Sequence, residues 1–222
     1  TVPIPTTPII MKSFIALALT IGVVLSTVPI PSTPEGYLFK PSPLAKVRFD
    51  IYEDLLCGDC KAFDPPFKQF LSTTWEGRPV TDFIEVYIHT YILPLHINAF
   101  TMSQVSPFIW DLHHNGTVNA AFNEWCFDHQ GEFKGVEGLN MTQYDVMDKL
   151  CHDTDSLFGY TEAECLEVLR SGKYEQTIHN EQKYGTWYRV YTTPGVFLNG
   201  VQVDDIPATE KAWANFMKRY LK

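Results

Sequence analysis

Alternation of apolar and polar residues predicts two strands in the first half of the chain. In Lys46–Tyr52, apolar Val47, Phe49 and Ile51 alternate with polar residues, which is the pattern of a strand with one buried face. Phe83–His89 is rich in the β-branched and aromatic residues that strands favour. We therefore expect a strand in each of these segments.

Helical spacing dominates the residues around these strands. Lys61–Trp75 places large apolar residues at helical intervals, and Pro65 and Pro66 are expected to kink this helix because proline lacks an amide donor. From about residue 98 to residue 184, amphipathic segments alternate with glycine and asparagine breaks. We interpret this stretch as a helical subdomain inserted after the second strand.

The C-terminal part returns to strand character and then ends in a helix. Val196–Asn199 and Val201–Val203 are joined at Asn199-Gly200, a pair typical of tight hairpins. Thr209–Leu221 spaces its apolar residues as a helix with one buried face does. The predicted order is strand, helix, strand, helical insert, hairpin and helix.

The N-terminal residues have the pattern of an export signal. A lysine follows Met11, and the apolar run Phe14–Leu25 is shorter than a membrane-spanning helix requires. We expect residues 1–26 to hold a signal peptide that starts at Met11, and residues 27–44 to form a proline-rich linker. Residues 45–222 would then form the folded domain, with its insert at about 98–184.

Composition and charge limit the classes of partner. The 222 residues are 45% hydrophobic, enough for one domain with a substantial core. The net charge is −9, and no basic stripe is present along the sequence. Because nucleic acids and anionic membranes select basic surfaces, we expect neither as a partner after signal cleavage.

Cys57-Gly58-Asp59-Cys60 stands where a predicted strand leads into a predicted helix. A cysteine at a helix N-terminus faces unpaired amides and the positive end of the helix dipole, which stabilise its thiolate. The thiolate is the form that attacks disulfides, and Cys60, one turn further on, can resolve the mixed disulfide. We therefore predict that Cys57 and Cys60 are catalytic, with Gly58 and Asp59 completing the motif.

This arrangement resembles the thioredoxin superfamily. Pro65 stands five residues after Cys60, where that family has a proline, and Thr193–Gly200 is similar to the family's cis-proline loop and following hairpin, with Pro194 as the cis residue. Within the superfamily, the helical insert and Leu93–Phe100 resemble proteins of the DsbA type.

The resemblance implies an α/β thioredoxin fold with a helical insertion after the second strand, as in DsbA. It also implies a thiol-disulfide oxidoreductase that needs no cofactor. Its partners would be client proteins bearing thiols or disulfides, together with a redox partner that recycles the dithiol. Thr193 and Pro194 would bind the client backbone.

Departures from the family pattern concern proton transfer and redox direction. Many members have a buried acid six residues before the first cysteine, where this chain has Ile51, so Asp50 or Glu53 is left to substitute. Asp59 replaces the histidine of DsbA oxidases and should raise the pKa of Cys57 relative to a histidine. Asp59 and Thr193 together predict a reductase or isomerase that is less oxidising than DsbA.

Two alternatives remain at this stage. Tyr52–Cys57 is similar to the segment before the active site in the lysosomal thiol reductase group. The Cys-Gln-His-Gly signature of that group is absent, and Cys126–Gly131 matches it only in part. The other alternative is a redox-inert protein of the secretory pathway that keeps the fold and uses it for binding or structure.

The other candidate residues concern stability and export. Cys151 and Cys165 are favoured as a structural disulfide, which leaves Cys126 free, although spacing does not exclude the other pairings. The sequons at Asn115 and Asn140 are candidate glycosylation sites. We expect the protein in the secretory pathway, in the lumen of the endoplasmic reticulum, in an endolysosomal compartment or secreted. The histidines near Cys126 match no metal-site spacing, so we predict no metal.

Overall fold

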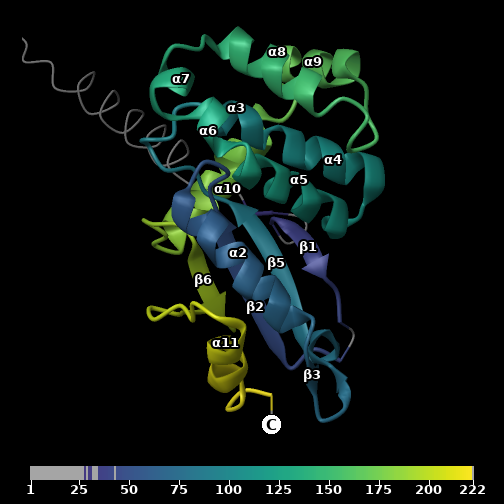
Figure 1. Ribbon diagram of the computed structural model, residues 1–222, viewed down its shortest axis with the longest axis vertical. Coiled ribbons are helices and arrows are strands. Elements are labelled where there is room, and N and C mark those ends of the chain that lie inside the picture. Colours follow the sequence, from purple (N-terminus) through teal and green to yellow (C-terminus); the bar gives the residue numbers. More distant parts are fainter. Residues whose placement is uncertain (1–27, 29, 32–34, 43, 222) are drawn as a thin grey trace, which may run out of the picture. The chain divides into compact units, whose positions relative to one another are not determined.

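The computed structural model describes residues 28, 30–31, 35–42 and 44–221 (Figure 1). The expected signal peptide over residues 1–26 lies outside this part of the chain. Residues 35–42 and 44–221 belong to one compact unit. Within the described residues, no helix combines the length and apolar character that crossing a membrane requires.

A mixed sheet lies at the centre of this unit. Its strand order is β1 (Tyr37–Lys40), β5 (Ile84–Thr90), β2 (Val47–Glu53), β6 (Gly195–Leu198) and β7 (Val201–Gln202). The central strand β2 runs parallel to β5 and antiparallel to β6, with Ile51 opposite Ile88 on one side and Val196 on the other. The two predicted strands and the predicted hairpin are therefore confirmed.

The first strand is a correction to the sequence analysis. Tyr37–Lys40 falls in the stretch expected to be a proline-rich linker, yet it pairs antiparallel with β5 at the sheet edge. Tyr37 and Phe39 are each 6% exposed, so their alternation is that of a strand with one buried face. Four residues between prolines are too few for periodicity to distinguish such a strand from an extended linker.

Two helices, α2 (Gly58–Leu71) and α11 (Glu210–Met217), pack on one face of the sheet (Figure 1). Their shared core is aromatic: the ring of Phe49 from β2 lies 5.3 Å from that of Phe67 and 5.8 Å from that of Trp213, both edge-on. Short elements, β3 (Thr74–Trp75), β4 (Arg78–Pro79) and the 3-10 helix η1 (Val80–Asp82), connect α2 to β5.

The helical insert follows β5, as predicted from the sequence, and has a core of its own. Its helices are α3 (Ala99–Ser103), α4 (Val105–His113), α5 (Gly116–Asp128), α6 (Gln130–Phe133), α7 (Gly135–Leu139), α8 (Gln143–Asp153) and α9 (Glu162–Ser171). Figure 1 shows these helices gathered at the end of the sheet where α2 begins. The last helix of the insert, α10 (Glu175–Trp187), packs against β5.

Candidate active site

Cys57 occupies the N-cap of α2. The chain leaves β2 at Glu53, and Cys57 has an extended backbone (φ −76°, ψ 125°) before the helix begins at Gly58. Its sulfur points at the loop before β6, where Sγ lies 3.3 Å from the carbonyl oxygen of Thr193 and donates to it when Cys57 is protonated. Strand β2 and the loop before β6 thus place Cys57 and Thr193 together, although 136 residues separate them.

The two thiols have opposite acid–base properties. The thiol of Cys60, then Thr193 and the backbone amides of Cys60 and Asp59, lower the pKa of Cys57 to about 5. Burial raises the pKa of Cys60 well above its usual value, and the hydrogen bond with Cys57 adds to this rise. Cys57 is therefore a thiolate at neutral pH, while Cys60 holds a proton, which are the states needed by a nucleophile and a resolving thiol.

Asp59 acts on Cys57 through its main chain. Its side chain is exposed, whereas its amide is among the groups that lower the pKa of Cys57. The main-chain amide at this position therefore favours the thiolate.

The predicted client-binding residues lie beside the thiolate. Thr193 is buried, and it is joined to Pro194 by a cis peptide bond directly before β6. Gly195, the first residue of β6, pairs with Tyr52 of β2. The loop is therefore held at the end of the sheet at which the largely buried Cys57 lies.

Glu53 is the acid that faces the dithiol. Its side chain is 3% exposed, and Asn123 of α5 donates to its Oε2 at 3.1 Å. Burial raises the pKa of Glu53 to about 8, and the charges of Asp64 and Cys57 add to this rise. The charge of Glu53 in turn raises the pKa of Cys60, so the carboxyl group and the resolving thiol are near neighbours.

Asp50, the other candidate acid, belongs to the opposite face of the sheet. It accepts from Arg48 and lies 2.9 Å from Nε2 of His89. Although burial raises its pKa, these two partners bring the pKa of Asp50 down to about 2. Asp50 is thus a charged member of an ion-pair network, and of the two acids Glu53 is the one whose charge raises the pKa of Cys60.

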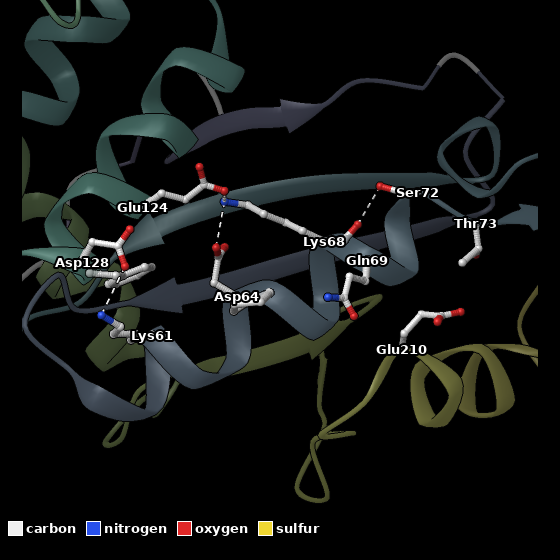
Figure 2. A pocket seen from close by; sticks show the side chains of 11 residues that line it. Lys61, Asp64, Lys68, Gln69, Ser72, Thr73, Glu124, Asp128 and Glu210 are labelled. Atoms are coloured by element: carbon white, nitrogen blue, oxygen red, sulfur yellow. Dashed lines mark hydrogen bonds and ion pairs between the residues drawn. The ribbon is translucent and has the colours of Figure 1, made fainter.

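A charged groove of about 700 Å³ runs along α2 from the residue after Cys60 (Figure 2). Lys68 lies in its middle, 2.9 Å from Asp64 and 2.5 Å from Glu124 of α5. Lys61 pairs with Asp128 at the end nearer Cys60. Because the charge of Asp64 helps to raise the pKa of Glu53, the groove brings charge close to the buried acid.

Asp54, which the sequence analysis did not single out, holds the turn before Cys57. It is fully buried, and its carboxylate accepts from the amides of Leu56 at 2.8 Å and Leu93 at 2.7 Å. Nδ1 of His96 lies 2.8 Å from the same carboxylate. An aspartate three residues before Cys57 resembles an ordinary turn residue, so its long-range contacts gave no signal in the sequence.

The remaining predicted residues lie away from the dithiol. Cys151 and Cys165 form a disulfide between α8 and α9, with a Cα–Cα distance of 5.5 Å, and Cys126 is a free, buried thiol. Asn115 and Asn140 are exposed at helix ends. In the part of the chain that the structure describes, no three histidine, cysteine, aspartate or glutamate side chains converge as metal ligands would.

Comparison with known proteins identifies the fold. No protein-family model and no curated protein sequence matches the chain. Among solved structures, it is similar to oxidised BdbD from Bacillus subtilis, with a TM-score of 0.63 and 13% identity over 85% of this chain and 99% of that one. It is also similar to DsbA from Chlamydia trachomatis, with a TM-score of 0.62 and 13% identity over 88% of this chain and 98% of that one.

A third similar structure is α-DsbA1 from Wolbachia pipientis, with a TM-score of 0.64 and 15% identity over 87% of this chain and 93% of that one. These likenesses cover the sheet and the helical insert together. The chain therefore has the DsbA-like thioredoxin fold that the sequence predicted.

Proposed function

We propose that this protein is a thiol-disulfide oxidoreductase that acts on protein clients through Cys57 and Cys60. The observation that carries the proposal is the division of acidity within the pair: the pKa of Cys57 is lowered to about 5, and that of Cys60 is raised by burial. A structural pair of buried cysteines has no need of a stabilised thiolate, whereas a nucleophile does.

The exchange proceeds in two steps. The Cys57 thiolate attacks one sulfur of a client disulfide, so that bond breaks, a Cys57–client disulfide forms, and the other client sulfur leaves as a thiolate. Cys60 then loses its proton and attacks Cys57, which releases the second client thiolate and leaves the Cys57–Cys60 disulfide. The client is reduced and the protein oxidised; the reverse sequence oxidises the client. A thiol or disulfide redox partner must restore the starting state.

Glu53 is the proposed proton acceptor in the second step. It is close enough to shift the pKa of Cys60, and at neutral pH it is mostly protonated because its own pKa is about 8. When Cys60 attacks, the proton of the thiol needs an acceptor, and the carboxylate form of Glu53 supplies one without opening the buried site to water. Thr193 and Pro194 would bind the client main chain beside Cys57.

The direction of the exchange follows from the acidity of Cys57. A pKa of about 5 lies between the values of about 7 in thioredoxin and about 3.5 in DsbA. A more stable thiolate makes the reduced form more stable and the pair more oxidising. We therefore expect a reduction potential between about −270 and about −120 mV, in the range of isomerases.

Equilibration with a glutathione redox series, followed by thiol trapping and mass spectrometry, tests the function. Cys57 and Cys60 should oxidise together with one midpoint in that interval, and Cys57→Ser should abolish the transition. Cys126→Ala is the matched control, because it removes the other free thiol of the described residues and should leave the midpoint unchanged. A pair that does not titrate would indicate a redox-inert binding protein.

We propose that the protein resides in the secretory pathway. The Cys151–Cys165 disulfide is of the kind that persists in oxidising compartments, and the sequon asparagines Asn115 and Asn140 are exposed. Expression of the full chain in a eukaryotic secretory system should give a product whose mass falls on treatment with an N-glycosidase. Asn115→Gln and Asn140→Gln should each remove one glycan, and an unglycosylated, unsecreted product would contradict this placement.

A further inference from the structure

Three consecutive carbonyl groups lead into the active-site helix, and all three accept hydrogen bonds from side chains of the helical insert. Nε2 of Gln130 donates to the carbonyl oxygens of Leu55 at 3.2 Å and Cys57 at 2.7 Å. Nζ of Lys134 donates to the carbonyl oxygen between them, that of Leu56, at 3.1 Å. These contacts join residues more than seventy positions apart in the sequence.

The two side chains form a connected unit. Gln130 is 5% exposed, and its Oε1 accepts from Nζ of Lys134 at 2.8 Å, so both ends of its amide are satisfied. The side chains of Leu55 and Leu56 are buried in the core of the same insert. The segment before Cys57 is therefore anchored in the insert by its main chain and by its side chains.

Lys134 also brings a positive charge to this segment without a carboxylate to neutralise it. Its ammonium group donates to the carbonyl of Leu56 and to the amide oxygen of Gln130, and it forms no ion pair with an acid of the described residues. Lys149, another lysine of the insert, is by contrast paired with Glu132 and Asp153. An unpaired ammonium group one peptide unit away from Cys57 favours a negative charge on that sulfur.

We propose that Gln130 and Lys134 are positioning residues of the redox centre, through which the helical insert holds the Cys57 peptide and stabilises the Cys57 thiolate. This inference rests on the proposed function. Because a stabilised thiolate favours the reduced pair, the unit makes the protein more oxidising than the same dithiol would be without it. The insert is then part of the redox machinery as well as a cover for the sheet.

Lys134→Met removes the charge and keeps most of the side-chain volume. Titration of the thiolate by its ultraviolet absorbance should show the pKa of Cys57 about one unit higher than in the unmodified protein. The equilibrium constant with glutathione should shift about tenfold toward the disulfide, which corresponds to about 30 mV. Lys134→Arg keeps the charge and the donors, and should restore both values.

Lys149→Met is the matched control. It removes a half-buried lysine of the same insert whose charge is already paired, so the pKa of Cys57 and the glutathione equilibrium should not move. Equal shifts in Lys134→Met and Lys149→Met would show a general effect of net charge and would overturn the proposal.

Gln130→Glu tests the hydrogen bonds. A carboxylate cannot donate to the carbonyls of Leu55 and Cys57, and its charge opposes the thiolate, so the pKa of Cys57 should rise further than in Gln130→Met. If Lys134→Met does not fold, Lys134→Gln is used to test the effect of the charge, because it removes the charge and retains a donor for the carbonyl oxygen of Leu56.

The two proposals fail in different ways. A wild-type pair that never oxidises in glutathione overturns the proposed function and the inference together. A wild-type pair with a normal midpoint, combined with folded Lys134 and Gln130 variants whose Cys57 pKa is unchanged, overturns the inference and leaves the function standing.

Discussion

Among the single residues, Glu53 has the largest expected effect on how stability depends on pH. Its pKa is raised by burial from about 4.5 to about 8. The unfolded chain therefore loses this proton as the pH rises through about 4.5, while the folded protein keeps it until about 8. The contribution of Glu53 to the free energy of unfolding is fully present below pH 4.5 and is lost progressively as the pH rises to 8. The loss by pH 7 is on the order of 3 kcal/mol.

Glu53→Gln should remove this dependence. Urea unfolding at pH 5, 7 and 8.5 should show the variant gaining stability relative to wild type as the pH rises, because the amide resembles the protonated acid in shape and charge. Other buried acids contribute equally to both proteins and cancel in the difference. Glu167→Gln, at an exposed carboxylate of α9, is the control and should give a small, flat difference. A flat difference for Glu53→Gln would mean that Glu53 is ionised in the folded state.

Asp54 is the residue whose loss should cost most stability near the active site. Asp54→Ala leaves the amides of Leu56 and Leu93 and the ring of His96 without their acceptor in a buried place, which should lower the free energy of unfolding by about 3 kcal/mol or more. Denaturant midpoints measure the effect. Asp145→Ala removes an exposed capping aspartate, and because water can satisfy the Thr142 groups that donate to it, the loss should be much smaller than for Asp54→Ala. Similar losses in the two variants would contradict this account.

At the scale of elements, the approach of α5 to the edge strand β1 depends on one glycine. A Cβ at Gly116 would lie 2.2 Å from the carbonyl oxygen of Leu38 and 2.8 Å from Cα of Phe39. Since backbone atoms cannot move aside as side chains do, Gly116→Ala should separate α5 from β1 and cost about 2–3 kcal/mol. Hydrogen exchange should show β1 losing protection first.

Gly131→Ala is the comparison within the same insert. A Cβ at Gly131, in α6, meets nothing within 4 Å, so the alanine should leave stability unchanged or raise it by up to about 1 kcal/mol. A loss of stability at Gly131 as large as that at Gly116 would show that the insert tolerates no added methyl group, whatever its contacts.

The lengths of the elements explain which of them the periodicity of apolar residues could predict. β2, β5 and the C-terminal helix are long enough for their apolar residues to repeat several times, and the hairpin has Asn199 and Gly200 with positive φ, as its turn requires. β1 is four residues long and lies among prolines, so the same reasoning assigned it to a linker.

At the scale of the whole molecule, the insert and the active-site helix should unfold together. Leu55 and Leu56 link the turn before Cys57 to the insert core, which also contains the Cys151–Cys165 disulfide. In a Cys57→Ser/Cys60→Ser background, reductant acts on that disulfide alone among the described cysteine pairs. Because the bond closes a loop of 14 residues, reduction should destabilise the protein by about 3 kcal/mol.

Thermal melting with and without reductant measures this effect. Far-ultraviolet circular dichroism should shift to lower temperature. In a variant whose other four tryptophans are replaced by phenylalanine, the fluorescence of Trp213, buried against the sheet, should shift by the same amount. If only the helical signal shifts, the insert unfolds separately, and the anchoring of the active-site turn is weaker than its contacts indicate.

The sequence by itself determined the elements and the nucleophile. Strand and helix periods, the Asn199-Gly200 turn and a cysteine pair at a strand-to-helix junction are local patterns, and local patterns depend on neighbouring residues alone. They were sufficient to predict the fold class and to single out Cys57 and Cys60.

Only the tertiary structure decided which groups surround the dithiol. Asp50 and Glu53 were equal candidates in the sequence, and packing placed Glu53 beside the thiols and Asp50 on the other face of the sheet. Gln130 and Lys134 reach the Cys57 turn across more than seventy residues. Hydrogen bonds between residues so far apart in the sequence depend on how separate elements pack. The period of the side chains determines which face of a helix or strand a residue occupies, but it does not determine which other element packs against that face.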